Sequence, residues 1–196
     1  MSFIEECGFV DKRREASVEL YDLLEISSAS KKRKELIRLM NRDPYFFDSY
    51  VVLSEELAAS GEVKESIKVL NEGYRKADEL LSFGGKGWPK VLAWGWHENR
   101  HIIRCLTNKA VLDWDLGDID SALKILRYLL ASNPSDNVGA RFYILAIKEG
   151  MSLSQYEDEI ERDGIVDDEF FEWFNRGIKK YSEEFSEWIK NSRDLM

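Results

Sequence analysis

Two stretches decide the fold: residues 50–70, YVVLSEELAASGEVKESIKVL, and residues 106–126, LTNKAVLDWDLGDIDSALKIL. In each stretch, apolar residues recur every three or four positions on both sides of a central glycine, Gly61 or Gly117. This spacing is typical of amphipathic helices, and glycine ends helices because it adopts left-handed backbone angles without strain. Each stretch therefore predicts two helices joined by a tight turn.

The two stretches align residue by residue. The glycines are 56 residues apart, so a repeat of roughly 34 residues leaves room for an inserted loop of roughly 22. Pro44 and Pro134 are 90 residues apart, which adds one further period. The matched positions are Tyr50 with Leu106, Ser54 with Ala110, Gly61 with Gly117, Ser66 with Ala122 and Leu70 with Leu126. The sequence thus predicts a repeated helical hairpin, with the insertion at about residues 83–96.

Both copies resemble tetratricopeptide repeats. In that family, small residues let paired helices approach closely, glycine turns the chain, and proline ends the second helix. The resemblance implies an all-α, right-handed superhelix of antiparallel helix pairs, and it implies no reaction. A group of bacterial and archaeal proteins with such repeats is also similar at Trp94-Gly95, Glu98-Asn99-Arg100 and Asn133-Pro134-Ser135-Asp136-Asn137.

Residues 1–43 predict an N-terminal helix pair in front of the repeats. We expect its first helix to begin near Asp11, which is a plausible cap, and its second to end before Asp43-Pro44, because the residue preceding proline avoids helical angles. The expected buried stripe of the first helix consists of Val18, Leu20, Tyr21, Leu23 and Leu24.

Residues 44–165 contain the repeats, with a third, degenerate copy after Pro134, and residues 166–196 predict one C-terminal capping helix. The capping helix carries an apolar seam at spacings of three and four residues. Its members are Phe171, Phe174, Ile178, Tyr181, Phe185 and Trp188. The seam either seals the last repeat against water or forms a homodimer interface.

The composition excludes several classes of ligand. A net charge of −9 repels phosphate backbones and anionic membrane surfaces, so we expect neither nucleic acid nor membrane as a partner. The basic run at residues 31–34 is more typical of a solvated helix face. Two distant cysteines and an acidic N-terminus predict a reduced, cytoplasmic protein.

Residues 97–101, HENRH, have the spacing that places two imidazoles on one helical face to bind zinc beside a glutamate base. A zinc-dependent hydrolase using His97, Glu98 and His101 is therefore an alternative function. Arg100 argues against a zinc site, because its positive charge would lie next to the metal ion. The competing interpretation is structural: Asn99 caps the following helix and Arg100 pairs with a carboxylate.

The inserted loop contains Gly84, Gly85 and Gly87 but lacks the spacing of a phosphate-binding loop, so we expect no nucleotide and no other cofactor. The loop also contributes three tryptophans. These either anchor a recognition surface or fill the gap beside the repeats. They are Trp88, Trp94 and Trp96.

The resemblance places the first helix of each pair along a concave groove, which includes Val51 and Glu55 in the first copy. We expect a protein- or peptide-binding scaffold without catalytic activity, whose partner includes an acidic segment held by Arg104 and Arg141. The expected groove residues are Arg104, Asn108, Val111, Trp114, Arg141 and Lys148.

Overall fold

A computed structural model describes residues 8–26, 28–82, 85, 87–161 and 168–193. Every regular element in these residues is a helix, which confirms the prediction of an all-α chain. None of these helices has the length and apolar character needed to cross a membrane. The chain divides into two compact units, residues 1–109 and 110–196.

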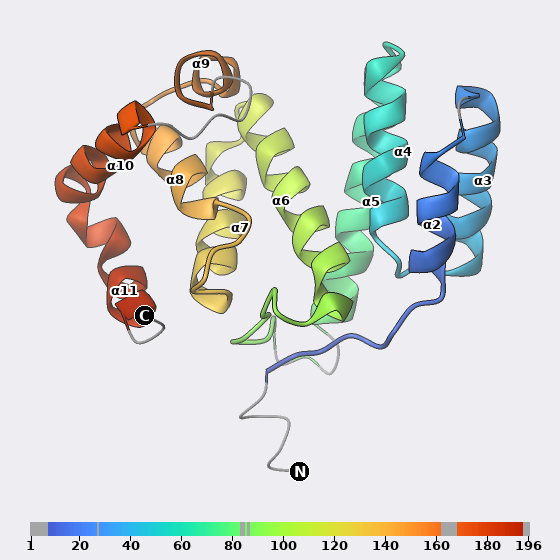
Figure 1. Cartoon of the computed structure of the whole chain (residues 1–196), viewed down its shortest axis with the longest axis horizontal. Helices are drawn as coiled ribbons and strands as arrows, with labels where there is room; N and C mark the ends of the chain where they lie inside the picture. The colour runs from blue at the N-terminus through green and yellow to red at the C-terminus, as the bar shows by residue number, and fades with distance from the viewer. Residues whose placement is uncertain (1–7, 27, 83–84, 86, 162–167, 194–196) are drawn as a thin grey trace. The chain divides into compact units, whose positions relative to one another are not determined.

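The first unit consists of successive helices that pack on one another, α2 on α3, α3 on α4 and α4 on α5 (Figure 1). A short 3-10 turn, η1 (His97–Asn99), leads into α6, whose first residues belong to this unit. The helices are α2 (Ala16–Leu24), α3 (Ala29–Arg42), α4 (Asp48–Ala59), α5 (Val63–Leu81) and α6 (Arg100–Asp115).

Helix α2 differs from its prediction in length and in its buried face. It begins at Ala16 rather than near Asp11, and its buried residues are Ala16 and Leu20, which lie one turn apart. Leu20 and Leu23 of the predicted stripe pack on the core, but Val18, Tyr21 and Leu24 are 63%, 74% and 46% exposed, so the predicted stripe is only partly right. The reason is that this short helix needs only one narrow face to pack on α3.

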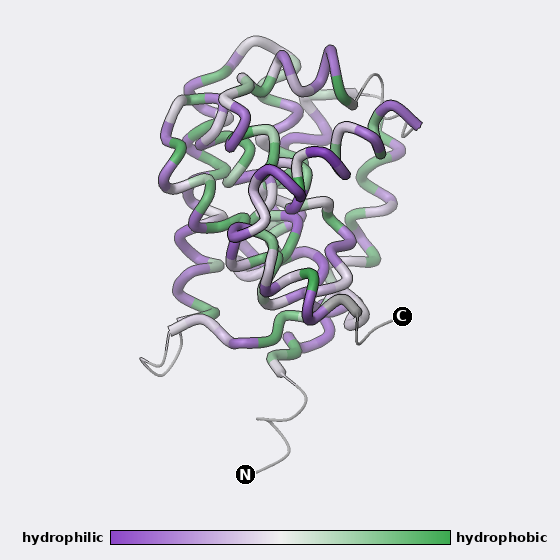
Figure 2. The backbone as a smooth tube through the Cα atoms, turned by 90° about the vertical axis from the view of Figure 1, so that its left-hand side faces the viewer, coloured by the Kyte–Doolittle hydropathy of each residue, from purple (hydrophilic) through white to green (hydrophobic). Residues whose placement is uncertain are grey.

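The second unit contains the end of α6 and the remaining helices. Helix α7 packs on α8, α8 on α10, α10 on α11, and α11 on α7. Hydrophobic and hydrophilic residues alternate along the helices, as amphipathic packing requires (Figure 2). The elements are α7 (Ile119–Ser132), α8 (Ala140–Lys148), α9 (Leu153–Tyr156), the π-helical turn η2 (Glu157–Glu161), α10 (Asp168–Lys180) and α11 (Ser182–Arg193).

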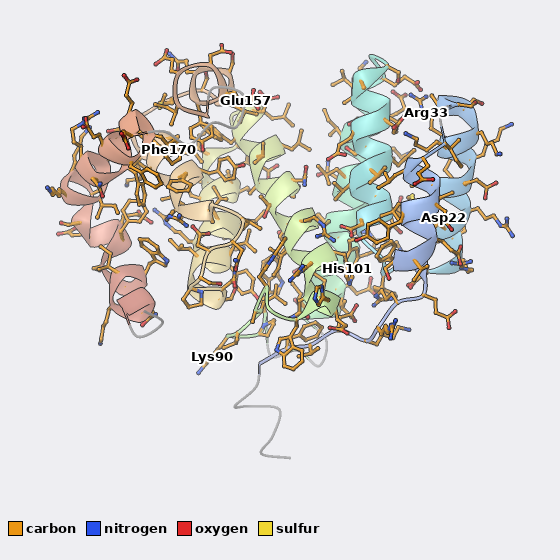
Figure 3. The ribbon with its side chains drawn as sticks, in the orientation of Figure 1. Asp22, Arg33, Lys90, His101, Glu157 and Phe170 are labelled. Carbon is orange, nitrogen blue, oxygen red and sulfur yellow. The ribbon has the colours of Figure 1, made fainter. Side chains whose placement is uncertain are left out.

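The predicted single capping helix is two helices, α10 and α11, separated at Tyr181. Phe174 and Phe185 of the predicted seam are buried, but Phe171 is half exposed and Phe170 takes its place inside. Phe170 lies 4.7 Å from Phe142 of α8, measured between ring centroids (Figure 3). The inner residues of the seam are thus covered within the chain, which favours the sealing role over a dimer interface.

The same turn occurs three times. Gly61, Gly117 and Gly150 have φ angles of 82°, 83° and 79°. In each turn the glycine N–H donates to the carbonyl three residues back, and the next N–H donates to the carbonyl five residues back. This pattern ends a helix with a left-handed residue. The matched environment of Gly61 and Gly117 confirms their predicted equivalence, and Gly150 adds a third member.

Candidate functional site

The first unit contains a cavity of about 670 Å³, a volume typical of ligand-binding clefts. Helices α2 and α4 and the beginning of α6 line it, together with a segment of extended chain before α2, which we call the strap (residues 8–14). A second hollow of about 580 Å³ is lined by five residues near the start of α2 and gathers fewer polar groups; these are Arg13, Arg14, Glu15, Val18 and Glu19.

The strap is held in place by backbone hydrogen bonds. The Phe9 N–H donates to the Val91 carbonyl at 2.9 Å, and the Asp11 N–H donates to Oδ1 of Asn99 at 3.0 Å. The Nδ2 amide of Asn99 donates to the Phe9 carbonyl at 2.7 Å. Asn99 is buried and binds the strap, so its predicted role as a cap of the following helix is wrong.

His101 joins the strap to the chain before α4 (Figure 3). Its Nδ1 accepts the Phe47 N–H at 3.2 Å, and its Nε2 lies 3.0 Å from Oδ2 of Asp11. Because Nδ1 accepts a hydrogen bond, the ring proton must lie on Nε2 and point to Asp11. Arg14 completes the network with hydrogen bonds to Asp11 at 2.6 Å and to Asp43 at 2.6 Å.

The charge of Asp11 is stabilised by this network. Burial alone would raise the pKa of Asp11, but hydrogen bonds from His101 and Arg14 and the positive charge of Arg14 hold it below its ordinary value. A buried carboxylate is tolerated in proteins when it is paired in this way. Asp11, which the sequence indicated as a helix cap, is therefore the centre of a buried polar network.

The zinc alternative finds no support in this geometry. Both ring nitrogens of His101 already have protein partners, whereas His97 is exposed at the rim. Among the residues that the structure describes, no three histidines, cysteines or carboxylates are grouped to hold a metal ion. Metal binding here would break the contacts that fix the strap and the chain before α4.

Two arginines lie against Trp94 at the cavity. The guanidinium carbon of Arg100 is 5.1 Å from the ring centroid of Trp94, and that of Arg104 is 5.8 Å away. Arg104 also forms a bidentate pair with Asp48, in which Nε donates to Oδ1 at 2.8 Å. Arg100 donates to the Trp94 carbonyl at 3.1 Å rather than to the predicted carboxylate.

The cavity presents several cations although the chain is acidic. Its lining contains five Lys or Arg side chains and three Asp or Glu side chains. Arg14 and Arg104 are neutralised by aspartates of the chain. Lys12 and Arg13 are exposed, and neither has an ion-pair partner among the described residues. These two cations of the strap, with Arg100, remain available to an anionic ligand.

An apolar surface lines the same cavity. Tyr21 and Leu24 of α2 are 74% and 46% exposed, and Val51 and Val52 of α4 belong to the same lining. Burial and the nearby charges of Asp48 and Glu56 raise the pKa of Glu55, the carboxylate at this part of the lining. The cavity therefore offers cations and apolar side chains together.

The predicted groove residues are distributed over both units. Arg104 lines the cavity, whereas the Asn108 amide donates to the Arg104 carbonyl of its own helix. In the second unit, Val111 is half-buried and Trp114 is buried, with its indole N–H donating to the Met151 carbonyl at 3.0 Å. Trp114 is therefore a packing residue.

The two predicted cations of the second unit contact other parts of that unit. Arg141 pairs with buried Asp136 at 2.7 Å and lies over the ring of Phe142. Burial raises the pKa of Asp136, although its hydrogen bonds to Arg141 and Ala140 oppose the shift. Lys148 is exposed, 3.8 Å from Glu184. Arg141 is thus held by its own unit rather than presented to a ligand.

The three tryptophans of the inserted loop have different environments. The Trp88 indole donates to Asp78 of α5 at 2.6 Å and its ring packs on Tyr74, so it fastens the loop to α5. Trp94 supports the two arginines of the cavity. Trp96 is 48% exposed. Of the three, Trp94 contacts side chains of the cavity lining, Arg100 and Arg104.

Sequence reasoning missed four residues of the site, Lys12, Arg13, Tyr21 and Leu24. A signal for the first two exists, since residues 12–14 form a basic run in an acidic chain. No such signal exists for Tyr21 and Leu24, because exposed and buried apolar residues of a short helix have the same spacing.

Comparison with known proteins identifies no relative of this chain. No protein-family model matches it, nor does any curated protein or solved structure. The geometry, charge and apolar character of the cavity are therefore what indicates a function.

Proposed function

We propose that this protein is a peptide- or protein-binding scaffold of the tetratricopeptide type, with its binding site in the cavity of the first unit. The observation that carries the proposal is that α2, α4 and the beginning of α6 all line one cavity. These are the first helices of successive hairpins, and the resemblance assigns the groove to the first helices.

The repeated turn at Gly61, Gly117 and Gly150 supports the same proposal, because it indicates a chain built from recurring helical hairpins. Stacked hairpins bury a continuous core and leave one side free for contacts. The exposed side chains of Tyr21 and Leu24 on α2 are suited to such a contact surface. Single exposed apolar residues are ordinary, but these line a cavity.

A peptide library tests the proposal. Purified protein is incubated with immobilised synthetic peptides of random sequence, and the retained peptides are identified. We expect wild-type protein to retain a reproducible set and Tyr21→Lys with Leu24→Lys to lose it. Both residues are exposed, so circular dichroism should show unchanged helicity.

Val63→Lys is the matched control, because Val63 is an exposed apolar residue at the start of α5, outside the cavity. It should retain the wild-type set. Retention of no peptide by wild-type protein, or of the same set by the double variant, would contradict the proposal.

A further inference from the structure

We infer that the ligand of this cavity is an acidic peptide segment carrying large apolar side chains, and that the strap supplies its charge selectivity. This inference rests on the proposed function and adds the chemical class of the ligand. Its basis is the pairing of two features in one cavity: unpaired cations of the strap and an exposed apolar face of α2.

The cations are positioned for an external ligand. Lys12 and Arg13 belong to a segment whose backbone is fixed by Asn99 and Val91, so their Cα atoms are not free to withdraw. Neighbouring Arg14 is buried and paired with Asp11 and Asp43. Lys12 and Arg13 are exposed, and neither forms an ion pair with a carboxylate among the described residues. A backbone that is already held in place loses less entropy when its side chains bind a carboxylate than a mobile one does.

Arg100 of α6 adds a third cation to the lining. Its guanidinium lies on Trp94 and its Nε is used by the Trp94 carbonyl, which orients the group without neutralising its charge. Arginine held in this way is suited to charge-assisted hydrogen bonds with a carboxylate. The net charge of −9 repels acidic ligands elsewhere on the chain, so the three cations Lys12, Arg13 and Arg100 give this cavity its selectivity.

The apolar requirement follows from Tyr21 and Leu24. Covering these side chains removes apolar surface from water, which a purely acidic segment cannot do. An acidic and apolar segment satisfies both parts of the lining.

The test is fluorescence anisotropy with four labelled peptides. The first alternates Asp and Phe. The others replace Asp by Asn, Asp by Lys, or Phe by Ser. We expect the Asp and Phe peptide to bind most tightly, the other three to have dissociation constants at least roughly ten-fold higher, and the affinity of the first to fall as salt is added.

Charge reversal locates the site. Lys12→Glu with Arg13→Glu should raise the dissociation constant of the Asp and Phe peptide by roughly ten-fold or more. The matched control is Lys31→Glu with Lys34→Glu, which changes the net charge equally through exposed residues of α3 outside the cavity. The control should have a much smaller effect.

Equal affinities for the Asp and Asn peptides would overturn the inference and leave the proposed function standing. An equal loss for both charge-reversed variants would show that binding follows net charge, which also overturns it. If none of the four peptides binds, the inference fails, and the random library shows whether the proposed function fails with it.

Discussion

The two histidines of the segment at residues 97–101 show how one short motif divides into different roles. His101 is buried, with Phe47 N–H on one nitrogen and Asp11 on the other. His97 is exposed at the rim of the cavity. Both histidines lie where η1 leads into α6, but the strap covers only His101. Their substitution should therefore have unequal effects.

His101→Ala should lower the free energy of unfolding by about 2 kcal/mol, because it leaves the buried Phe47 N–H without a partner and removes one hydrogen bond from the buried Asp11 carboxylate, which Arg14 still binds. His97→Ala, at the exposed position, should change it by less than about 0.5 kcal/mol. Urea denaturation followed by circular dichroism measures both. Equal losses in the two variants would contradict the network described for His101.

Asp11 predicts a dependence of stability on pH. Its folded-state pKa lies below the ordinary value of 3.8, so the network stabilises the charged form. This stabilisation is present above the ordinary pKa and is lost as the pH falls through the folded-state pKa. Asp11→Asn should cost about 2 kcal/mol at pH 7, and the difference from wild type should narrow below about pH 4. Urea denaturation across this range measures it, and a difference independent of pH would contradict the assignment.

At the scale of elements, the repeated glycine turn sets where hairpins form. A Cβ atom added at Gly61, Gly117 or Gly150 would meet nothing within 4 Å, so a substitution there strains only the backbone. Alanine at each position should cost about 1–2 kcal/mol, and asparagine should cost less because it tolerates left-handed angles. Thermal or urea denaturation measures the series. A neutral effect of alanine at all three positions would contradict the shared turn.

Helices α4 and α5 meet at a pair of serines that occupy the small positions of the first repeat copy. The Ser54 and Ser66 hydroxyl oxygens are 2.9 Å apart, and each hydroxyl also donates to the other residue's carbonyl. The second copy has Ala110 and Ala122 at the matched positions.

Single changes of Ser54 or Ser66 to alanine should each cost about 1 kcal/mol, since each leaves buried polar groups unmatched. The double change restores the residue types of the second copy and should cost less than the sum of the single changes. A double-mutant cycle by urea denaturation measures the coupling. Strict additivity would mean that the two hydroxyls do not interact.

The sequence predicted the elements well where local chemistry decides them. The equivalence of Gly61 and Gly117 follows from the apolar spacing and the glycine turn, both of which are local. The prediction of a single capping helix was wrong. The apolar spacing continues through Tyr181, but the helical backbone ends at Lys180 and begins again at Ser182. The buried face of α2 was only partly right, since the spacing does not show how few neighbours a short helix has.

At the scale of the whole molecule, the site itself was only partly predictable. Arg104, expected in a groove of the repeats, lines the cavity, but the strap was not expected near it. Asp11 reaches Asn99 and His101 across 88 and 90 positions of sequence. No periodicity records such a contact, because a hydrogen bond between distant residues leaves no pattern in either segment alone. The basic run at residues 12–14 was the one feature of the sequence that indicated a role for the strap in binding.

The most direct measurement is an NMR titration of isotope-labelled full-length protein with the Asp and Phe peptide, following the backbone amide signals. Binding in the cavity predicts saturable shifts that cluster in the strap, in α2, in α4 and in the first turn of α6, with little change in α3 or in residues 110–193. Shifts confined to α3 or to residues 110–193, or no saturable shift at all, would contradict the cavity as the binding site.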